Sequence, residues 1–287
     1  SDNSYSDTGL QASTTYYYRV YVMDMVNQHT ESNVVSATTL NQLGNWSINA
    51  TLGTTLTAVD ALNESFAYAV GSGGVIYYYN GSEWNPESSP TTSTIYDIKI
   101  ISQTDIWAVG NDIYHFNGVS WSVAYETNTC YSIDVVSATD IYVGSINGII
   151  YHYDGSAWTF TTANAGHIKD IQMDASDSGW ALASDGEILY YNGFGWSLQH
   201  DIERSSCTTI SVSSTSDIWV GSAQQFDGVT KLGHWDGSEW LVVLNGYGRK
   251  INSMRALSGS DIWFIGSNPY YGDSGTNISH WNGTSLQ

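Results

Sequence analysis

Short runs of alternating hydrophobic and polar residues, separated by turn-forming residues, cover most of this chain. The clearest series lies in residues 131–162, which contain YSIDVVS, DIYVG, IIYHYDG and AWTFTT in succession. Alternation with a period of two residues gives each run one apolar face, as in a half-buried strand. The pattern therefore predicts four consecutive antiparallel strands here and, because similar series recur, an all-β protein.

The end of the third strand in each series carries a repeated signature. An aromatic run is closed by an Asn-Gly or Asp-Gly pair, which begins at Asn80, Asn117, Asp154, Asn192, Asp236 and Asn282. After five of these six pairs a Trp follows at a fixed offset, at positions 84, 121, 158, 196 and 240. Both positions of such a pair tolerate positive φ, so the signature predicts a two-residue hairpin turn between the third and fourth strands.

A repeat of about 40 residues with four strands is typical of a β-propeller blade, and the chain resembles that class. First strands are expected to start near Leu56, Ile95, Cys130, Ile168, Cys207 and Ile251, which gives six four-stranded blades within residues 41–287. The sixth unit ends before its fourth strand, whereas residues 44–51 (GNWSINAT) have the form of a fourth strand. We expect residues 44–51 to join the last blade and close the ring. The alternative is a longer natural chain with more blades.

Residues 1–40 follow a different pattern. Leu10, Ala12, Thr14 and Tyr16 fall on the Leu-x-Pro-x-Thr-x-Tyr corner of fibronectin type III domains, with Ala12 in place of the usual Pro. The segment resembles the C-terminal part of such a domain, which implies that Tyr16 is the corner tyrosine, bonded to upstream backbone. Because the chain begins at Ser1 and enters in mid-pattern, we expect it to be part of a larger multidomain chain.

Two positions change together between repeats. Four units have Asp at the start of the second strand and His near the end of the third, and these pairs are Asp105 and His115, Asp140 and His152, Asp217 and His234, and Asp261 and His280. The other two units have Phe66 with Tyr78 and Ser178 with Tyr190. We predict a buried Asp–His hydrogen bond in each of the four blades, similar in role to the structural His–Asp contacts of WD40 repeats. A catalytic dyad or a metal site is the weaker interpretation, because a feature copied four times is typical of scaffold.

Equivalent positions assign two further layers. The second strands carry aromatic residues that we expect to pack between blades rather than bind sugar, namely Tyr68, Trp107, Tyr142, Trp180, Trp219 and Trp263. The middle of the first strands is expected to line the central channel with Asp60, Lys99, Asp134, Gln172, Ser211 and Arg255. Such a polar ring would hold water or an ion, and a solvated lining is the simpler interpretation.

Symmetry between the repeats is broken in the last two units. The loops 222–231 and 267–276 are long, and cations with tyrosines gather in or beside these loops and the neighbouring links. The candidate ligand-binding residues are Arg204, Lys231, Tyr247, Arg249, Lys250, Arg255, Tyr270 and Tyr271. A patch of aromatic and cationic side chains suits a sugar or an acidic group, although ordinary surface variation would give the same pattern.

Composition restricts the partners and the setting. Eight Lys and Arg residues against 28 Asp and Glu give a formal net charge of −20, which disfavours nucleic acid and anionic membranes. No apolar run approaches the roughly 18 residues of a membrane helix, so membrane insertion is not expected. Cys130 and Cys207 belong to repeats that are not neighbours and are predicted to be buried free thiols. Asn-x-Ser/Thr sequons, such as those at Asn63 and Asn80, favour a secreted or cell-surface location.

These observations favour a non-catalytic extracellular binding or adhesion module that recognises a glycan or an extracellular protein through the loop face of blades 5 and 6. No cofactor is predicted, and calcium is kept as the one ion to test. One alternative is a sialidase-like glycoside hydrolase, built on Glu203, Arg204, Tyr247, Arg249 and Arg255. The Ser-x-Asp-x-Gly-x-x-Trp box of that family is missing from these repeats. The other alternative is a structural spacer or filament subunit, which needs no pocket.

Overall fold

The computed structural model divides into two units, Ser1–Thr51 and Leu52–Gln287. It describes residues 15–18, 21–23, 29–31, 35–38, 52–201, 207–222, 231–245, 250–267 and 276–285. In the first unit, β1 (Thr15–Tyr18) pairs antiparallel with β4 (Val35–Thr38), and β2 (Tyr21–Met23) pairs with β3 (His29–Glu31). The alternating segment around Tyr16 is therefore strand, while Leu10, Ala12 and Thr14 lie outside the described residues.

The second unit consists of consecutive antiparallel sheets, one for each sequence repeat. Blade 1 contains β5 (Leu56–Asn63), β6 (Phe66–Gly71), β7 (Ile76–Tyr79) and β8 (Trp84–Glu87), and blade 2 contains β9 (Asp97–Ser102), β10 (Asp105–Val109), β11 (Ile113–Phe116) and β12 (Trp121–Tyr125). Blade 3 contains β13 (Cys130–Ser137), β14 (Asp140–Ser145), β15 (Ile149–Tyr153) and β16 (Trp158–Thr162), and blade 4 contains β17 (Ile168–Ala175), β18 (Ser178–Ala183), β19 (Glu187–Tyr191) and β20 (Trp196–Asp201). Blade 5 contains β21 (Cys207–Ser214), β22 (Asp217–Ser222), β23 (Lys231–Trp235) and β24 (Trp240–Asn245), and blade 6 contains β25 (Lys250–Ser258), β26 (Asp261–Ser267) and β27 (Thr276–Trp281). Short 3-10 turns, Ser72–Gly74 and Ile146–Gly148, link the second and third strands of blades 1 and 3.

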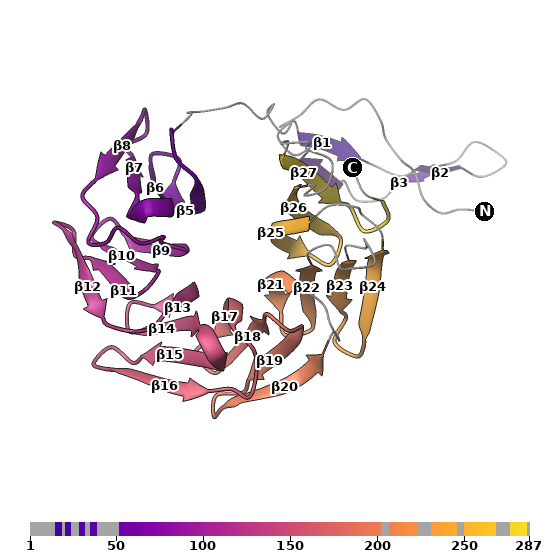
Figure 1. Ribbon diagram of the computed structural model, residues 1–287. Coiled ribbons are helices and arrows are strands. Elements are labelled where there is room, and N and C mark those ends of the chain that lie inside the picture. Colours follow the sequence, from indigo (N-terminus) through magenta and orange to yellow (C-terminus); the bar gives the residue numbers. More distant parts are fainter. Residues whose placement is uncertain are drawn as a thin grey trace. The chain divides into compact units, whose positions relative to one another are not determined.

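The blades follow one another around an axis, with the first strand of each innermost (Figure 1). Contacts run from β5 to β9, β13, β17, β21 and β25 in that order. Five of the sheets have four described strands and the sixth has three. The predicted six-bladed propeller is confirmed, and residues 44–51, expected to complete blade 6, lie outside the described residues.

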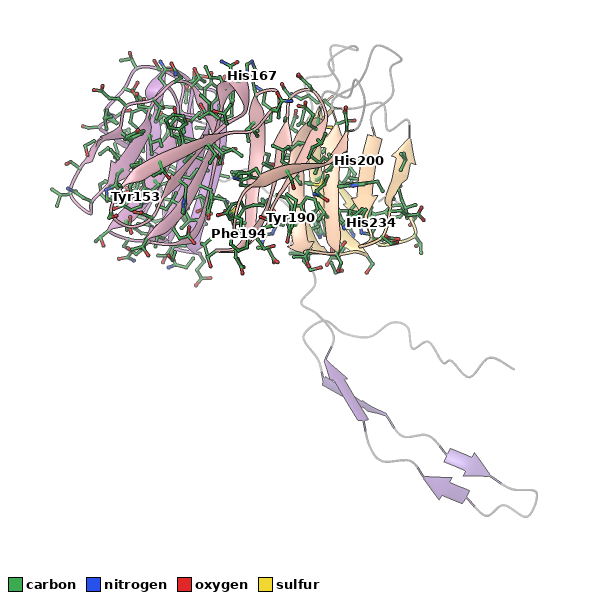
Figure 2. All side chains as sticks on the ribbon, turned by 90° about the horizontal axis from the view of Figure 1, so that it is seen from below. Tyr153, His167, Tyr190, Phe194, His200 and His234 are labelled. Atoms are coloured by element: carbon green, nitrogen blue, oxygen red, sulfur yellow. The ribbon has the colours of Figure 1, made fainter. Side chains whose placement is uncertain are left out.

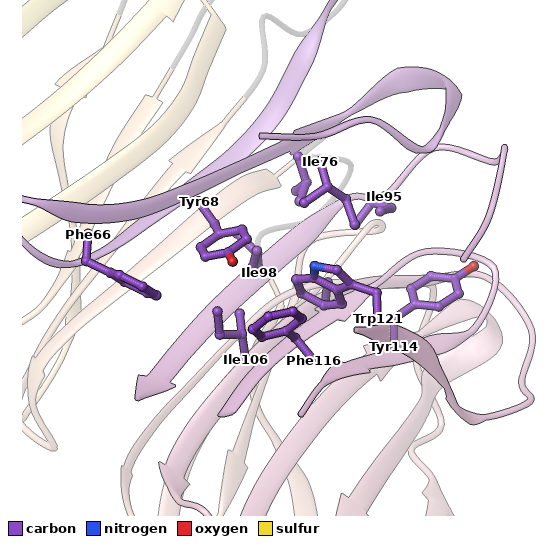
Figure 3. Close-up of a cluster of buried hydrophobic side chains, with 11 residues drawn as sticks. Phe66, Tyr68, Ile76, Ile95, Ile98, Ile106, Tyr114, Phe116 and Trp121 are labelled. Atoms are coloured by element: carbon purple, nitrogen blue, oxygen red, sulfur yellow. The ribbon is translucent and has the colours of Figure 1, made fainter. Parts of the chain in front are cut away.

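The hydrophobic core lies between neighbouring blades. Figure 3 shows the cluster between blades 1 and 2, where Tyr68 from β6 packs against Ile98, Phe116 and Trp121 of the next blade. The ring centroids of Tyr68 and Trp121 are 6.1 Å apart in an edge-on arrangement. The predicted packing role of the second-strand aromatics is thus present at this position, and burial of such large rings supplies much of the association between blades.

The same packing recurs around the axis. Trp107 contacts Tyr153 and Trp158 of the following blade, and Tyr142 contacts Tyr191 in the same way. Cys130 and Cys207 are buried free thiols within these inter-blade cores, as the sequence predicted. None of the helical segments in the described part of the chain is long or apolar enough to span a membrane.

The turn after each third strand differs from the predicted two-residue turn. Tyr79 pairs with Trp84, so the link in blade 1 contains four residues, and the Asn80 side-chain oxygen accepts hydrogen bonds from the backbone N–H groups of Ser82 and Glu83. Gly81 has a φ of 92°, whereas the only described non-glycine residue with positive φ is Asn147. The prediction of a two-residue turn is therefore wrong, because the Asn or Asp side chain satisfies the donors of a wider turn.

Candidate functional site

One side chain from each blade lines a single pocket of about 500 Å³ at the axis. The six residues occupy equivalent places in the repeats, directly after the residue that opens each first-strand repeat, and they are Thr57, Tyr96, Tyr131, Lys169, Thr208 and Asn252. Ser184 and Lys250 complete much of the remaining wall. Because all six blades contribute, the pocket is a property of the whole second unit, and we call it the axial pocket.

A repeated β-bulge explains why these side chains reach the axis. In blade 3, Cys130 pairs with Ser145 and Ser132 pairs with Gly144, so Tyr131 has no partner in the ladder. The register skips the equivalent residue in blades 1, 4, 5 and 6 as well. A bulge inserts an unpaired residue and redirects its side chain, and bulges are enriched beside functional sites.

Aromatic and cationic groups meet on one side of the axial pocket. The Tyr96 and Tyr131 rings lie 5.3 Å apart at an angle of 53°. The Lys169 ammonium lies 3.5 Å from the centre of the Tyr131 ring, which is a cation–π contact. Burial, and then the nearby charge of Lys250, lower the pKa of Lys169.

His167 lies beside Tyr131, and its acceptor nitrogen is already hydrogen-bonded to the protein backbone. Its Nδ1 accepts a hydrogen bond from the backbone N–H of Asn147 at 3.0 Å, so that nitrogen carries no proton. The imidazole also lies 6.1 Å from the Tyr131 ring. Figure 2 shows His167 at one end of the blades and His234 and Phe194 at the other. The axial pocket therefore opens at the end opposite to the Asn-Gly and Asp-Gly turns.

Below the pocket, four of the six residues expected to line the channel connect neighbouring blades. Side chains from the middle of one first strand accept hydrogen bonds from the backbone of the next first strand, at 2.7–2.9 Å, and the four pairs are Asp60 with Ile100, Asp134 with Met173, Gln172 with Val212 and Ser211 with Ala256. First strands have no neighbour within their sheet on this edge, so their N–H groups need other partners. The polar ring thus has a structural role that the sequence analysis did not predict.

A second row of carboxylates makes the same type of bond. Asp97 accepts from the N–H of Ile133 at 3.0 Å, and Asp170 accepts from that of Ile210 at 2.8 Å. Burial raises the pKa of Asp97 to about 6, although Lys99 opposes this shift. Burial likewise raises the pKa of Asp170 to about 7. Burial disfavours the ammonium of Lys99, but Asp134, 3.1 Å away, and Asp97 hold its pKa above the usual value.

The Asp and His of each coupled pair lie within hydrogen-bond distance, away from the axial pocket. The four Asp Oδ1–His Nε2 distances are 2.8 Å in blade 2, 2.7 Å in blade 3, 2.7 Å in blade 5 and 2.9 Å in blade 6. The expectation that these pairs are buried is wrong, because the His side chains are 17–32% exposed. Each pair lies near the end of its blade, so part of the imidazole is exposed to solvent.

The neighbouring aromatic explains why Asp and His occur together. In blade 5 the Trp219 Nε1–H donates to Asp217 Oδ1 at 2.9 Å, and the Trp219 and His234 rings stack with centroids 4.1 Å apart. Trp107 donates to Asp105 in the same way. Blade 4 lacks the Asp, and there the buried Trp180 Nε1 has no hydrogen-bond partner among the residues that the structure describes. Asp, Trp and His therefore form one structural unit within the blade.

Of the predicted ligand-binding residues, Lys250 lines the axial pocket. Arg255 lies in the middle of β25, opposite Trp263, and is exposed. Lys231 opens β23, and its side chain is outside the described residues, as are Arg204, Tyr247, Arg249, Tyr270 and Tyr271.

Tyr96, Tyr131 and Lys169 were not among the predicted site residues, although the sequence carries a signal for them. The position after each first-strand opening residue varies in chemistry from blade to blade, while the residue before it and the residue two places after it stay apolar. No group of three or more His, Cys, Asp or Glu side chains suited to a metal ion occurs among the residues that the structure describes.

Comparison with known proteins agrees with this architecture. No protein-family model matches the chain, and no curated protein matches its sequence. Among solved structures, it is similar to YCF48 from Cyanidioschyzon merolae, with 14% identity and a TM-score of 0.59 over 82% of this chain and 84% of that chain. It is also similar to the WD40 repeats of RRP9 (10% identity, TM-score 0.60, 80% and 77% covered) and to a chain of a mitotic checkpoint complex (11% identity, TM-score 0.62, 93% and 82% covered). At these identities the likeness is one of fold, and that fold is the β-propeller.

Proposed function

We propose that this protein is a non-catalytic extracellular binding module that recognises a carbohydrate, or an exposed segment of a partner protein, at the axial pocket. The observation that carries the proposal is that one side chain from every blade, in five blades from a β-bulge, converges on a single pocket of about 500 Å³. This volume lies within the roughly 300–1,000 Å³ of small-molecule sites. The pocket-lining residues differ from blade to blade, whereas the cores between the blades repeat. Variable side chains on a constant scaffold are expected of a recognition surface.

The chemistry of the wall favours carbohydrate as the ligand. Tyr96 and Tyr131 offer two adjacent rings that suit the apolar face of a sugar, and their hydroxyls suit its polar rim. A protein partner is the second candidate. It is supported by the fold, since one propeller of similar structure belongs to a mitotic checkpoint complex.

The wider setting remains part of the proposal. The sequons and the acidic composition support a secreted or cell-surface location, and the fibronectin-like pattern of residues 1–40 supports a larger multidomain chain. The sialidase-like alternative depends mainly on Glu203, Arg204, Tyr247 and Arg249, which lie outside the described residues. Incubation with a fluorogenic sialoside distinguishes it, because a binding module releases no product.

A glycan array tests the proposal directly. The full chain is applied with and without calcium, beside Tyr131→Ala, which removes one wall of the pocket. Phe194→Ala is the matched control, because Phe194 is 98% exposed and lies at the other end of the blade (Figure 2). We expect binding that Tyr131→Ala abolishes and Phe194→Ala retains. Binding that survives Tyr131→Ala unchanged would place the site elsewhere.

A further inference from the structure

The axial pocket holds two cations without a carboxylate partner among the described residues. Neither Lys169 nor Lys250 forms a salt bridge within that part of the chain, whereas Lys99, deeper among the first strands, pairs with Asp134 at 3.1 Å. The chain has only eight Lys and Arg residues against 28 Asp and Glu, so two cations left unpaired in one pocket are notable. The contact of Lys169 is instead with the face of the Tyr131 ring.

The two lysines line the same pocket, so their like charges repel each other. Burial and the charge of Lys250 together lower the pKa of Lys169. An anion bound between the two ammonium groups would relieve this repulsion and would gain a charge-assisted hydrogen bond. The two lysines therefore make the pocket electrostatically favourable for a negative group.

Negative charge outside the pocket wall limits which anion is accepted. Asp97 and Asp170 directly follow Tyr96 and Lys169 in the sequence, and the whole chain carries a formal charge of −20. This field repels densely charged polyanions, such as nucleic acid or highly sulfated chains. A ligand with about one negative charge per ring suffers less repulsion and still meets the lysines, while its ring can lie against Tyr96 or Tyr131.

We infer that the axial pocket binds an acidic sugar of the uronate class, with its carboxylate at Lys169 and Lys250 and its ring against the tyrosines. This inference rests on the proposed function and specifies its ligand class. The recognition is non-covalent, and no bond of the sugar is formed or broken.

Isothermal titration calorimetry with matched ligands tests the inference. The probes are short oligomers of galacturonate, guluronate and glucuronate, each beside its methyl ester, which keeps the ring and removes the charge. The proteins are the wild type, Lys169→Met, Tyr131→Ala and Phe194→Glu. The last is the control, because Phe194→Glu changes the net charge by the same amount as Lys169→Met, but at an exposed site at the other end of the blade. Thermal unfolding verifies that all variants are folded.

We expect at least one oligouronate to bind the wild type and its methyl ester to bind about tenfold more weakly, as loss of a charge-assisted hydrogen bond predicts. Lys169→Met should weaken uronate binding by a similar factor, Tyr131→Ala should weaken both ligands, and Phe194→Glu should bind as the wild type does. Uronate affinity should also fall as sodium chloride is raised.

Other outcomes overturn the inference in distinguishable ways. Equal binding of acid and ester, lost in Tyr131→Ala but kept in Lys169→Met, would reject the acidic ligand and leave the proposed pocket intact. Uronate binding that none of the pocket variants changes would reject both the ligand and the pocket. If no uronate binds, the inference fails, and the glycan array and an acidic-peptide titration decide separately whether the proposed function stands.

Discussion

The Asp170 carboxylate accepts a hydrogen bond from the backbone N–H of Ile210 at 2.8 Å, and this bond joins the first strands of blades 4 and 5. Asp97 makes the equivalent bond to Ile133 between blades 2 and 3. Burial raises the pKa of Asp170 to about 7 and that of Asp97 to about 6, from an ordinary 3.8. Inter-blade contacts are thus made by groups that the fold prefers to protonate near neutral pH.

This arrangement predicts a pH dependence of stability with a definite sign. A carboxyl whose pKa is higher in the folded protein than in the unfolded chain binds protons preferentially in the folded state. Its stabilising contribution is complete below about pH 4 and is lost as the pH rises through 6 for Asp97 and 7 for Asp170. The contribution of these two groups to the free energy of unfolding should therefore fall between pH 4 and pH 8, as urea titrations at several pH values would measure.

Replacement of Asp170 isolates its part of that effect. Asp170→Asn keeps an oxygen for the Ile210 N–H and removes the charge, so it should raise the free energy of unfolding at pH 8, by on the order of 2 kcal/mol, and flatten the pH profile. Asp134→Asn is the contrasting variant, because it keeps the bond to Met173 but breaks the ion pair with Lys99. It should destabilise the protein at pH 8. Two variants with the same sign would contradict the account.

The Asp–Trp–His unit of blade 5 predicts a loss of stability without a loss of binding. The Asp217 carboxylate accepts from Trp219 and from the Ser213 hydroxyl and is bonded to His234, so Asp217→Ala removes a partner from three polar groups. We expect a decrease in the free energy of unfolding of about 2–4 kcal/mol. Ligand binding at the axial pocket should be unchanged in protein that remains folded, because the unit lies at the other end of the blade (Figure 2). A selective loss of binding or activity would instead favour a functional Asp–His dyad.

Blade 4 allows the converse test, in which the missing unit is built. Ser178 and Tyr190 occupy the Asp and His positions, and the Trp180 Nε1 between them is buried without a partner. Ser178→Asp supplies an acceptor for Trp180, and Tyr190→His supplies a second donor for the new carboxylate. In a double-mutant cycle, the two substitutions together should be more favourable than the sum of the single changes, by about 1 kcal/mol. Strict additivity would show that the residues of the unit act independently.

Two turn glycines, Gly155 and Gly195, should respond differently to replacement by Ala in the free energy of unfolding. Gly155 has a φ of 88°, and an added Cβ would lie 2.7 Å from the Thr139 Cβ. Gly195 has no atom within 4 Å of an added Cβ. Gly155→Ala should therefore lower the free energy of unfolding by about 1–3 kcal/mol, through strain and close contact, whereas Gly195→Ala should change it by less than about 0.5 kcal/mol. Thermal and urea unfolding of the two variants measure the difference.

The architecture could be predicted from the sequence because it repeats. Residues such as Trp107 and Trp219 recur at equivalent places in the blades, and the contacts between neighbouring blades recur with them. The coupled change at Ser178 and Tyr190 likewise allowed the Asp–His contacts to be predicted from the sequence. Burial of those contacts was not predictable, since it depends on how far the blade end extends past the imidazole.

The axial pocket was harder to predict for a physical reason. Period-two alternation assigns each residue to one face of a strand, and a bulge breaks that rule at Tyr131 and Lys169. The bonds from Asp60 and Asp97 to the next blade were missed for a related reason. They depend on the spacing between sheets, which no pattern within a single strand reports.

The repeated bulge also has an evolutionary consequence. Because the residue at each of the five bulges has no partner in the ladder, it can be exchanged while the paired residues on either side stay as they are. The five bulged residues and Tyr96 of blade 2 line one pocket, so duplication or exchange of a whole blade changes one part of the pocket wall. A propeller of this kind can change its ligand by recombining blades, while the paired strands and the cores between the blades stay the same.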